Sequence, residues 1–311
     1  MDPISLGTRR IRSVFAAFLA ATVMGLGPCT AWGQQAPSEL AEGIFLISGL
    51  GSNVLAVTAP DGVLLIDNGH SRSVESLNAQ IAALDSGPVR LAINTHFHFD
   101  HVGGNEALGR ADATIIGHRN CRERMRADWV VPERFGIRWP RVPPYPEVAL
   151  PALTFDRALQ LHFGEHDIEA LHFPNAHSDA DIAVFLRDAN VLHTGDLYLS
   201  NGFPIIDSFH GGSIDGQLAA LDGLIALIDE GTIVVPGHGP VSDRGGLQAY
   251  RTMLSTGRDR ILDLISQGLT LEEVVEADPT AGLYAGGDSW LDPKVFVWTV
   301  FVDLTGGGSG S

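Results

Sequence analysis

Lysine is almost absent from this chain. Of its 20 basic side chains, 19 are arginine and one is lysine, Lys294, which lies near the C-terminus in no recognisable motif. A catalytic Schiff base and a phosphate-binding loop both depend on a lysine in a defined setting. The sequence therefore argues against both chemistries.

Cysteine is also scarce, with only Cys29 and Cys121 among the 311 residues. Cys29 falls in an N-terminal segment that we expect to be removed, so Cys121 would remain alone. A single cysteine cannot form an internal disulfide, and the mature protein must be stabilised by core packing or by a metal. We expect Cys121, on a charged helix, to be an inert buried thiol.

Basic residues are also few compared with acidic ones. The chain has 37 acidic and 20 basic residues, a formal net charge of −17. This balance argues against a function that depends on gripping DNA, RNA or an acidic membrane. The remaining composition, 45% hydrophobic and 18% charged, is that of a globular protein with a sizeable core.

The N-terminal apolar run, Val14–Leu26, is too short for a transmembrane helix. It follows three arginines and precedes small residues at Ala31-Trp32-Gly33, the pattern of a cleavable signal peptide. We predict that residues 1–33 are a signal peptide and that the mature protein is periplasmic or secreted, without stable membrane insertion. Removing three arginines and one aspartate would change the net charge from −17 to −19. At the other end, residues 305–311 are predicted to be a flexible tail or linker.

Residues 34–304 are predicted to form one α/β domain. The first three apolar runs, separated by Gly, Asn and Pro, predict an antiparallel meander, and later runs predict mixed strand and helix units. Helices packed outside two central sheets would satisfy this order. The expected strands are 44–48, 53–58, 62–66, 89–95, 113–117, 158–163, 168–173, 182–187, 191–194 and 232–235. The expected helices are 73–84, 119–128, 214–229 and 247–266. Asp292-Pro293 is typical of a helix cap and first turn, so a final helix is expected through Val302, against the low helix propensity of its β-branched residues.

The segment from Trp129 to Pro151 is rich in proline, arginine and aromatic residues and has no periodicity. A loop of this length in a compact domain is usually functional, commonly a lid or a wall of the substrate site. The alternative is a surface excursion without a function.

Histidine and aspartate gather after the strand expected at 89–95. The stretch His96-Phe97-His98-Phe99-Asp100-His101 is followed by Val102 and two glycines. In an extended segment alternate side chains share a face, so His96, His98 and Asp100 can converge while the two phenylalanines point into the core. Three imidazoles and a carboxylate suit zinc.

Three further candidates, His177, Asp196 and His238, each follow an apolar strand and lie next to Gly, Asn or Pro. Because ligand sites in α/β proteins gather where strands end, these loops can meet at one rim. Taken singly, a loop histidine is more often solvated or hydrogen-bonded than a ligand. Together with the first stretch, the three supply enough ligands for two metals. Seven other histidines match no motif and are interpreted as structural: His70, His118, His162, His166, His172, His193 and His210.

These motifs resemble those of the metallo-β-lactamase-fold hydrolase superfamily. The resemblance runs from about Glu42 to His238 and includes Ile66-Asp67-Asn68-Gly69, the His96–His101 motif, His177, Gly195-Asp196 and Gly237-His238-Gly239. It implies a four-layer αβ/βα sandwich with a two-metal site at the edge of its sheets. It also implies the ligand roles: His96, His98 and His177 for one zinc; Asp100, His101 and His238 for the second; Asp196 bridging both.

Two zinc ions lower the pKa of a shared water and give a hydroxide nucleophile near neutral pH. Asp100 is predicted to orient this nucleophile and to shuttle its proton. Asp67 is either an acceptor that fixes a ligand imidazole or simply a turn-forming aspartate. Tyr198 is either a donor to the developing oxyanion or, as we favour, part of the core packing.

The resemblance implies a hydrolase of small molecules, and we expect two Zn²⁺ ions and the opening of a cyclic amide or ester, a β-lactam or a lactone. β-Lactamases of this fold have Cys or Ser where Asp196 stands, whereas lactonases and glyoxalase II-like thioesterases have Asp. The β-lactamases also often hold the substrate carboxylate with Lys or Ser. In this chain, Arg138 or Arg141 would have to take that role. A thioesterase is therefore an alternative, and an iron-dependent oxidoreductase or a metal-stabilised binding protein is an alternative from another class.

Overall fold

The computed structural model describes Met1, residues 36–128, Glu133, residues 141–284, Gly286, Ser289 and residues 291–306. The chain divides into the units Met1–Gly33 and Gln34–Ser311, and the fold given below is that of the second unit. The predicted signal peptide apart from Met1, most of the first half of the 129–151 loop, and residues 307–311 lie outside the described residues.

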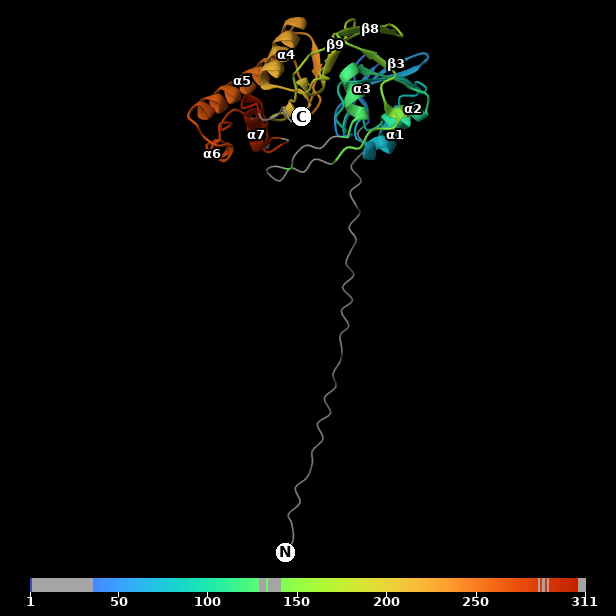
Figure 1. Cartoon of the computed structure of the whole chain (residues 1–311). Helices are drawn as coiled ribbons and strands as arrows, with labels where there is room; N and C mark the ends of the chain where they lie inside the picture. The colour runs from blue at the N-terminus through green and yellow to red at the C-terminus, as the bar shows by residue number, and fades with distance from the viewer. Residues whose placement is uncertain are drawn as a thin grey trace. The chain divides into compact units, whose positions relative to one another are not determined.

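Twelve described strands form two sheets (Figure 1). The first sheet follows chain order: β1 (Ser38–Ala41), β2 (Ile44–Ile47), β3 (Val54–Ala59), β4 (Gly62–Ile66), β5 (Val89–Asn94), β6 (Thr114–His118) and β7 (Leu153–Phe155). Strands β1 to β4 pair antiparallel, as a meander, and β4 to β7 pair parallel. The parallel half directs the carboxyl ends of β4, β5 and β6 to one edge.

The second sheet has the order β12-β11-β10-β9-β8. Its strands are β8 (Ala158–Phe163), β9 (His166–His172), β10 (Ile182–Leu186), β11 (Val191–His193) and β12 (Ile233–Val235). All neighbours are antiparallel except β11 and β12, which are parallel. The ends of β11 and β12 therefore also lie at one edge.

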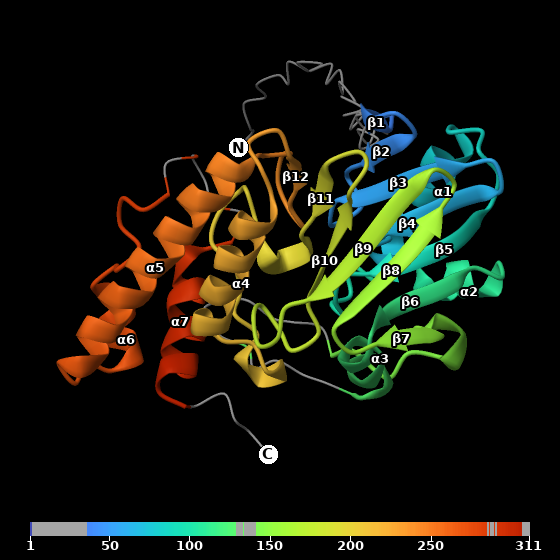
Figure 2. The ribbon, with the colours of Figure 1, turned by 90° about the horizontal axis from the view of Figure 1, so that it is seen from above.

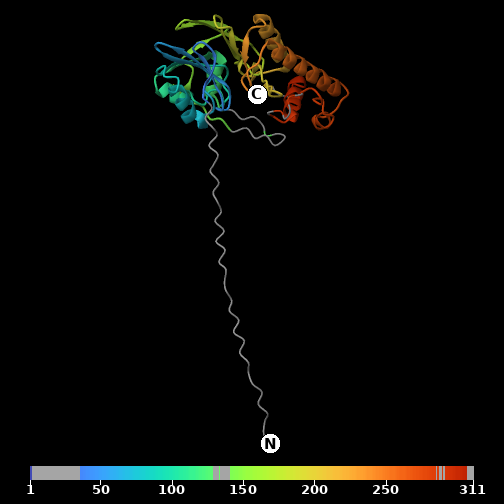
Figure 3. The ribbon, with the colours of Figure 1, turned by 180° about the vertical axis from the view of Figure 1, so that it is seen from behind.

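Helices cover the outer faces of both sheets (Figure 2). They are α1 (Val74–Ala82), α2 (Asn105–Arg110), α3 (Arg119–Arg126), α4 (Ile214–Leu227), α5 (Arg244–Ser266), α6 (Leu271–Glu276) and α7 (Pro293–Leu304). In Figures 2 and 3, α1 and α2 lie outside the first sheet and α4, α5 and α7 lie outside the second. This is the predicted four-layer αβ/βα sandwich. Among the described residues, no helix is both long enough and apolar enough to cross a membrane.

The alternation of side chains along the strands produces these layers. In β10, Ile182, Val184 and Leu186 belong to the core between the two sheets, while Ala183 and Phe185 belong to the core beneath α4, α5 and α7. In β3 and β4, every second residue likewise packs toward α1 and α2. Strands buried on both faces need apolar residues at every position, and β4 and β10 have almost only such residues.

Segments with weak patterns are where sequence and structure differ. The strands β1 and β7 and the helices α2 and α6, all of six residues or fewer, were not predicted. The final segment is a helix, α7, as Asp292-Pro293 predicts and in spite of its valines. Asp292 caps this helix by accepting the Lys294 N–H at 3.0 Å, Pro293 stands in its first turn, and six consecutive residues from Val295 to Val300 are buried. Tertiary burial therefore outweighs the low helix propensity of valine.

Two stacked histidines join the ends of β6 and β9. The rings of His118 and His172 have centroids 3.6 Å apart and planes 10° apart. Their Nε2 atoms lie 3.1 Å from the backbone oxygens of Asp156 and Asp179 respectively. Burial lowers the pKa of both imidazoles, and the His172 ring lowers that of His118 further.

Because of the His118–His172 pair, we expect the free energy of unfolding to fall in acid. A histidine with a folded-state pKa below its unfolded value of about 6.5 contributes fully above that pH and loses its contribution as the pH falls toward the folded pKa. Replacing His172 with phenylalanine retains the stacked ring and removes one titrating group. We expect the unfolding free energy to fall less steeply from about pH 7 to about pH 5 in His172→Phe than in the unmodified protein.

The measurement is chemical denaturation at several pH values. Gln160→Phe serves as the control, because Gln160 is an exposed residue of β8 without a titratable group, and should leave the slope unchanged. Equal slopes for His172→Phe and the unmodified protein would show that the pair does not contribute to acid sensitivity.

Candidate metal centre

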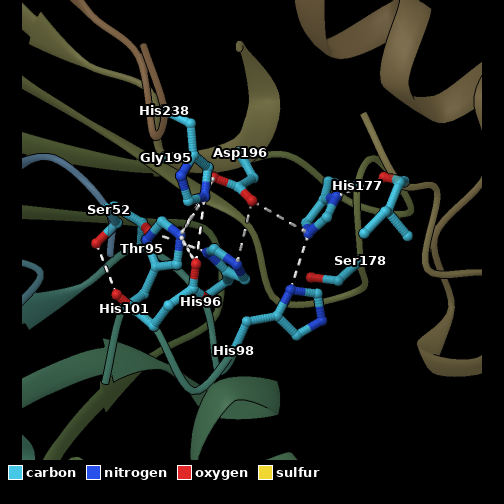
Figure 4. A network of polar contacts seen from close by, with 12 residues as sticks. Ser52, Thr95, His96, His98, His101, His177, Ser178, Gly195, Asp196 and His238 are labelled. Carbon is cyan, nitrogen blue, oxygen red and sulfur yellow. Dashed lines mark hydrogen bonds and ion pairs between the residues drawn. The ribbon is translucent and has the colours of Figure 1, made fainter. Parts of the chain in front are cut away.

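The structure brings all seven predicted ligand residues together where the two sheets meet at one edge. They form two groups, and within each group one ligand atom from every residue lies within 4.8 Å of the others. The first group is His96, His98, His177 and Asp196; the second is Asp100, His101 and His238. Figure 4 shows the imidazoles of both groups around Asp196. Both groups are positioned to bind metal ions.

Each predicted residue is placed by the end of a strand. His96, His98, Asp100 and His101 follow β5, which ends at Asn94. His177 precedes β10, Asp196 lies in a 3-10 turn (η3, Gly195–Leu197) after β11, and His238 follows β12. The strand ends therefore converge as the sequence predicts.

Asp196 faces both groups. Its Oδ2 lies 4.0 Å from His96 Nε2 and 3.8 Å from His177 Nε2. Its Oδ1 lies 3.2 Å from His101 Nε2 and 3.5 Å from His238 Nε2. A carboxylate that bridges two cations requires this placement of one oxygen toward each group.

Two glycines make the placement of Asp196 sterically feasible. Gly195 has φ +51°, and a Cβ there would lie 2.6 Å from Thr95 Oγ1. A Cβ at Gly237 would collide with Asp196 Oδ1 itself. The glycines next to Asp196 and His238 are therefore required by close approach of the backbone to the centre.

Hydrogen bonds at the far side of three rings fix their tautomers. His98 Nε2 lies 2.9 Å from Asp207 Oδ2, His177 Nδ1 lies 2.7 Å from the backbone oxygen of Ile205, and His101 Nδ1 lies 2.7 Å from Asp67 Oδ2. A carboxylate or carbonyl oxygen only accepts, so each of these nitrogens carries the hydrogen.

The other nitrogen of each ring then presents a lone pair to the centre. His98 Nδ1 and His177 Nε2 are 3.0 Å apart, and His101 Nε2 and His238 Nε2 are 3.4 Å apart. The lone pairs of His98 Nδ1 and His177 Nε2 repel one another at this distance unless a cation lies between them. In addition, His96 Nε2 and Asp196 Oδ1 are buried without a hydrogen-bond partner. These observations fit a metal centre.

Burial keeps two imidazoles of the first group, His96 and His177, in the neutral form that ligates metal. It lowers the pKa of His177 to about 4, assisted by nearby His98, and it lowers that of His96 well below the usual range, assisted by His101 and His98. Burial would raise the pKa of Asp196, but His238 and His101 outweigh it and hold that pKa well below its usual range. Burial would also lower the pKa of His98, but the hydrogen bond and the charge of Asp207 outweigh it and raise that pKa. His96 and His177 are therefore the neutral imidazoles of the group, and neutral imidazoles beside a carboxylate are donors that a divalent cation requires.

Asp67 is both a turn-forming aspartate and an acceptor for a predicted ligand imidazole, the two roles that the sequence left open. Its φ of +59° is the left-handed conformation of a tight turn. Its carboxylate accepts hydrogen bonds from the backbone N–H and the hydroxyl of Thr95, both at 2.8 Å, and from His101. The carboxylate thus connects the end of β5 with the orientation of the His101 ring.

Three buried asparagines hold the loop that follows His101. Asn68 and Asn94 both donate to Asn105 Oδ1, at 2.6 and 3.0 Å, and Asn105 donates back to Asn94 at 2.8 Å. The Gly104 N–H donates to Asn68 Oδ1 at 2.7 Å. The amide network is fully buried and joins the end of β4, the end of β5 and the start of α2.

No sequence motif indicates Asp207, which orients a predicted ligand. Asp207 is buried, lies 109 residues after His98, and accepts hydrogen bonds from His98 and from His210 Nδ1 at 2.8 Å. His210, interpreted as structural, therefore contacts this carboxylate. The available signal was an acid placed directly after the apolar run that ends at Ile206. Tyr198, in contrast, donates to or accepts from Ser242 at 2.8 Å and packs against Tyr250, so we assign it to the core.

Comparisons with known proteins agree with the fold. The sequence profile described as the metallo-beta-lactamase superfamily matches residues 47–238. Acyl-coenzyme A thioesterase MBLAC2 from Bos taurus is 28% identical over 231 residues, which cover 65% of this chain and 80% of that protein. A metallo-beta-lactamase from Pontibacter korlensis has a TM-score of 0.57 at 20% identity, covering 70% of this chain and 98% of that one. The sec-alkylsulfatase Pisa1 from Pseudomonas sp. has a TM-score of 0.64 at 16% identity, covering 86% and 50%. At these identities the two solved structures show a shared fold.

Proposed function

This chain belongs to the metallo-β-lactamase superfamily, and from that premise we propose that it is a dinuclear zinc hydrolase that opens a cyclic ester, a lactone, at its carbonyl carbon. The single observation that carries the proposal is the position of Asp196, with one oxygen toward each ligand group. By the sequence resemblance, lactonases and thioesterases have an aspartate at the position of Asp196, whereas β-lactamases have Cys or Ser there. A β-lactam is therefore the less favoured cyclic substrate.

The residues of the two groups have distinct roles in this proposal. His96, His98 and His177 would hold one zinc, Asp100, His101 and His238 the other, and Asp196 would bridge them. Zinc ions so placed would lower the pKa of water and polarise a carbonyl oxygen. The donor set of nitrogen and oxygen atoms suits zinc and also accepts iron.

Asp100 is the group that we propose to move the proton. Its side chain is 15% exposed, whereas the other six side chains are 8% exposed or less. Its Oδ2 lies 3.3 Å from His238 Nε2. A carboxylate at the open side of the centre can accept a proton from water and exchange it with solvent.

A thioester is the second candidate substrate, and a specific observation favours it. The relative from Bos taurus is named as an acyl-coenzyme A thioesterase and matches 65% of this chain. A thioester and a lactone share the acyl carbon at which water would attack. They differ in the leaving group. A thioester releases a separate thiol, whereas the alcohol formed from a lactone stays attached to the product.

We also propose that the enzyme acts outside the cytoplasm. The proposal is supported by the basic opening, the short apolar run and the small residues before Gln34. A mature chain starting at Gln34 would contain the whole of the described domain.

The test is a hydrolysis panel with the zinc-loaded protein, expressed with its leader. The panel contains acyl-homoserine lactones, acyl-coenzyme A, S-lactoylglutathione, aryl esters and the β-lactam nitrocefin. We expect turnover of lactones or thioesters well above that of nitrocefin, its loss on removal of metal by a chelator, and its return with zinc. In the same preparation, intact mass should place the N-terminus at Gln34.

Two outcomes would contradict the proposal. One is a lack of turnover on every acyl substrate by a protein that holds two zinc ions. The other is retention of iron with consumption of oxygen, which would identify an oxidoreductase instead.

A further inference from the structure

The tripeptide Gly51-Ser52-Asn53, here called the 51–53 turn, directly precedes β3 and contacts two separate parts of the second ligand group. Ser52 and Asn53 are polar but buried, with 5% and 7% of their surface exposed. Buried polar side chains need hydrogen-bond partners, and the partners of these two lie next to Asp100 and His238.

Ser52 contacts Asp100. Its hydroxyl donates a hydrogen bond of 2.7 Å to the backbone oxygen of Asp100, drawn as a dashed line from Ser52 in Figure 4. Gly51, with φ +111°, lies so close that a Cβ there would be 3.3 Å from the Asp100 Cβ. The backbone of Asp100 is thus held against the 51–53 turn.

Asn53 contacts the loop of His238 on both sides. Its Nδ2 donates to the backbone oxygens of Pro236 at 2.9 Å and Gly239 at 2.8 Å. Its own N–H donates to the oxygen of Gly237 at 2.8 Å. One residue, 183 positions earlier in the chain than Pro236, therefore binds three carbonyls around His238.

The loop of His238 needs such support. His238 stands between Gly237 and Gly239, and glycine gives a backbone its greatest conformational freedom. The opposite side of the loop is held separately, because the Gly237 N–H donates to the Gly195 oxygen at 2.9 Å and the Ser200 N–H donates to the His238 oxygen at 3.0 Å. Without the Asn53 side chain the loop would remain attached on the side of Asp196, and on the side of the 51–53 turn it would keep only the bond from the Asn53 N–H to Gly237.

We propose that Ser52 and Asn53 are positioning residues for the second metal site, which fix the spacing of Asp100 and His238 before a metal binds. The Oδ2 of Asp100 and the Nε2 of His238 are 3.3 Å apart, although Asp100 follows a strand of the first sheet and His238 follows a strand of the second. Ligand atoms must be held to within about 0.5 Å for a productive site. The inference rests on the proposed function, because it requires that Asp100, His101 and His238 hold a metal ion.

The test titrates metal-free protein with Co²⁺ and follows the two equivalents by their visible absorption. The variants are Asn53→Ala, Ser52→Ala and Ser52→Thr, the last of which retains a hydroxyl. Asn190→Ala is the matched control, because Asn190 precedes β11 at the end away from the centre and its amide donates to Asp229 at 3.1 Å.

We expect Asn53→Ala to raise the dissociation constant of the weaker equivalent about 10- to 100-fold, and Ser52→Ala to raise it about tenfold, the range known for residues that support metal ligands. The tighter equivalent should stay within about twofold of the unmodified protein in every variant. Ser52→Thr and Asn190→Ala should bind both equivalents normally.

Three outcomes would overturn the inference. Normal binding of both equivalents by Asn53→Ala and Ser52→Ala would exclude a positioning role. Equal weakening of both equivalents, with a lower melting temperature, would show a structural role alone. Failure of the unmodified protein to bind a second equivalent would overturn the two-metal function itself, and this result is distinguishable because it does not depend on any variant. If Asn53→Ala does not fold, Ser52→Ala and Ser52→Thr decide the question.

Discussion

Asp196→Asn is expected to release metal from both ligand groups and to lower hydrolysis in parallel. Asp196 is the residue whose two oxygens lie within 4.0 Å of imidazole nitrogens from both groups. Asparagine has nearly the same volume but no charge. The substitution therefore removes the negative charge between the two groups and leaves no cavity. Removing one partner from a buried charged set costs about 3–5 kcal/mol, which corresponds to about 10²- to 10⁴-fold in metal affinity.

The measurement is metal content per chain after gel filtration, together with turnover of the best substrate at low and high zinc. We expect substoichiometric metal and low turnover at low zinc, with partial recovery at high zinc. Asp222→Asn is the control, because Asp222 is a highly exposed partner of Arg251 and should behave as the unmodified protein. Two full equivalents of metal in Asp196→Asn would mean that Asp196 does not bridge the groups.

The fold and the site were predictable where their determinants are local. The His96–His101 motif is contiguous, and β5 presents it through the simple alternation of an extended chain. His177, Asp196 and His238 could be found because each lies beside a strand end, and strand ends of neighbouring strands meet. The start of the helix α7 is likewise local, at Asp292-Pro293, whereas the burial that stabilises this helix in spite of its valines is a property of the folded protein.

Asp67 was a candidate for such a supporting role, but Asn53 and Asp207 could not be predicted, because their contacts with the site exist only in the folded protein. Asn53 lies 183 residues from the carbonyl of Pro236 that it binds, and Asp207 lies 109 residues from His98. Neither belongs to a periodic pattern, and Asn or Ser before a strand is equally typical of an ordinary turn. The ligands of a metal are restricted to a few residue types, but the groups that orient those ligands include any polar side chain and any backbone carbonyl. Their identification therefore requires the three-dimensional structure.

Asp100→Asn is expected to lower kcat by about 10²- to 10⁴-fold, the range attributed to a positioned general acid or base. The amide retains an oxygen that can ligate metal but has no basic site for a proton. We therefore expect the variant, at saturating zinc, to hold both metal equivalents and to bind substrate with little change in KM. The measurement combines metal content, KM and kcat under the same conditions.

The comparison of the two aspartate variants separates metal binding from proton transfer. If Asp100 acts only as a ligand, Asp100→Asn should resemble Asp196→Asn, with turnover that follows metal content and recovers as zinc is raised. If Asp100 moves the proton, turnover stays low even when both equivalents are bound, because added zinc cannot replace a base. Asp61→Asn, at an exposed position between β3 and β4, controls for the charge change. Turnover at the unmodified rate in zinc-saturated Asp100→Asn would assign the proton transfer to another group, and the exposure of Asp100 at the open side of the centre would then reflect metal ligation alone.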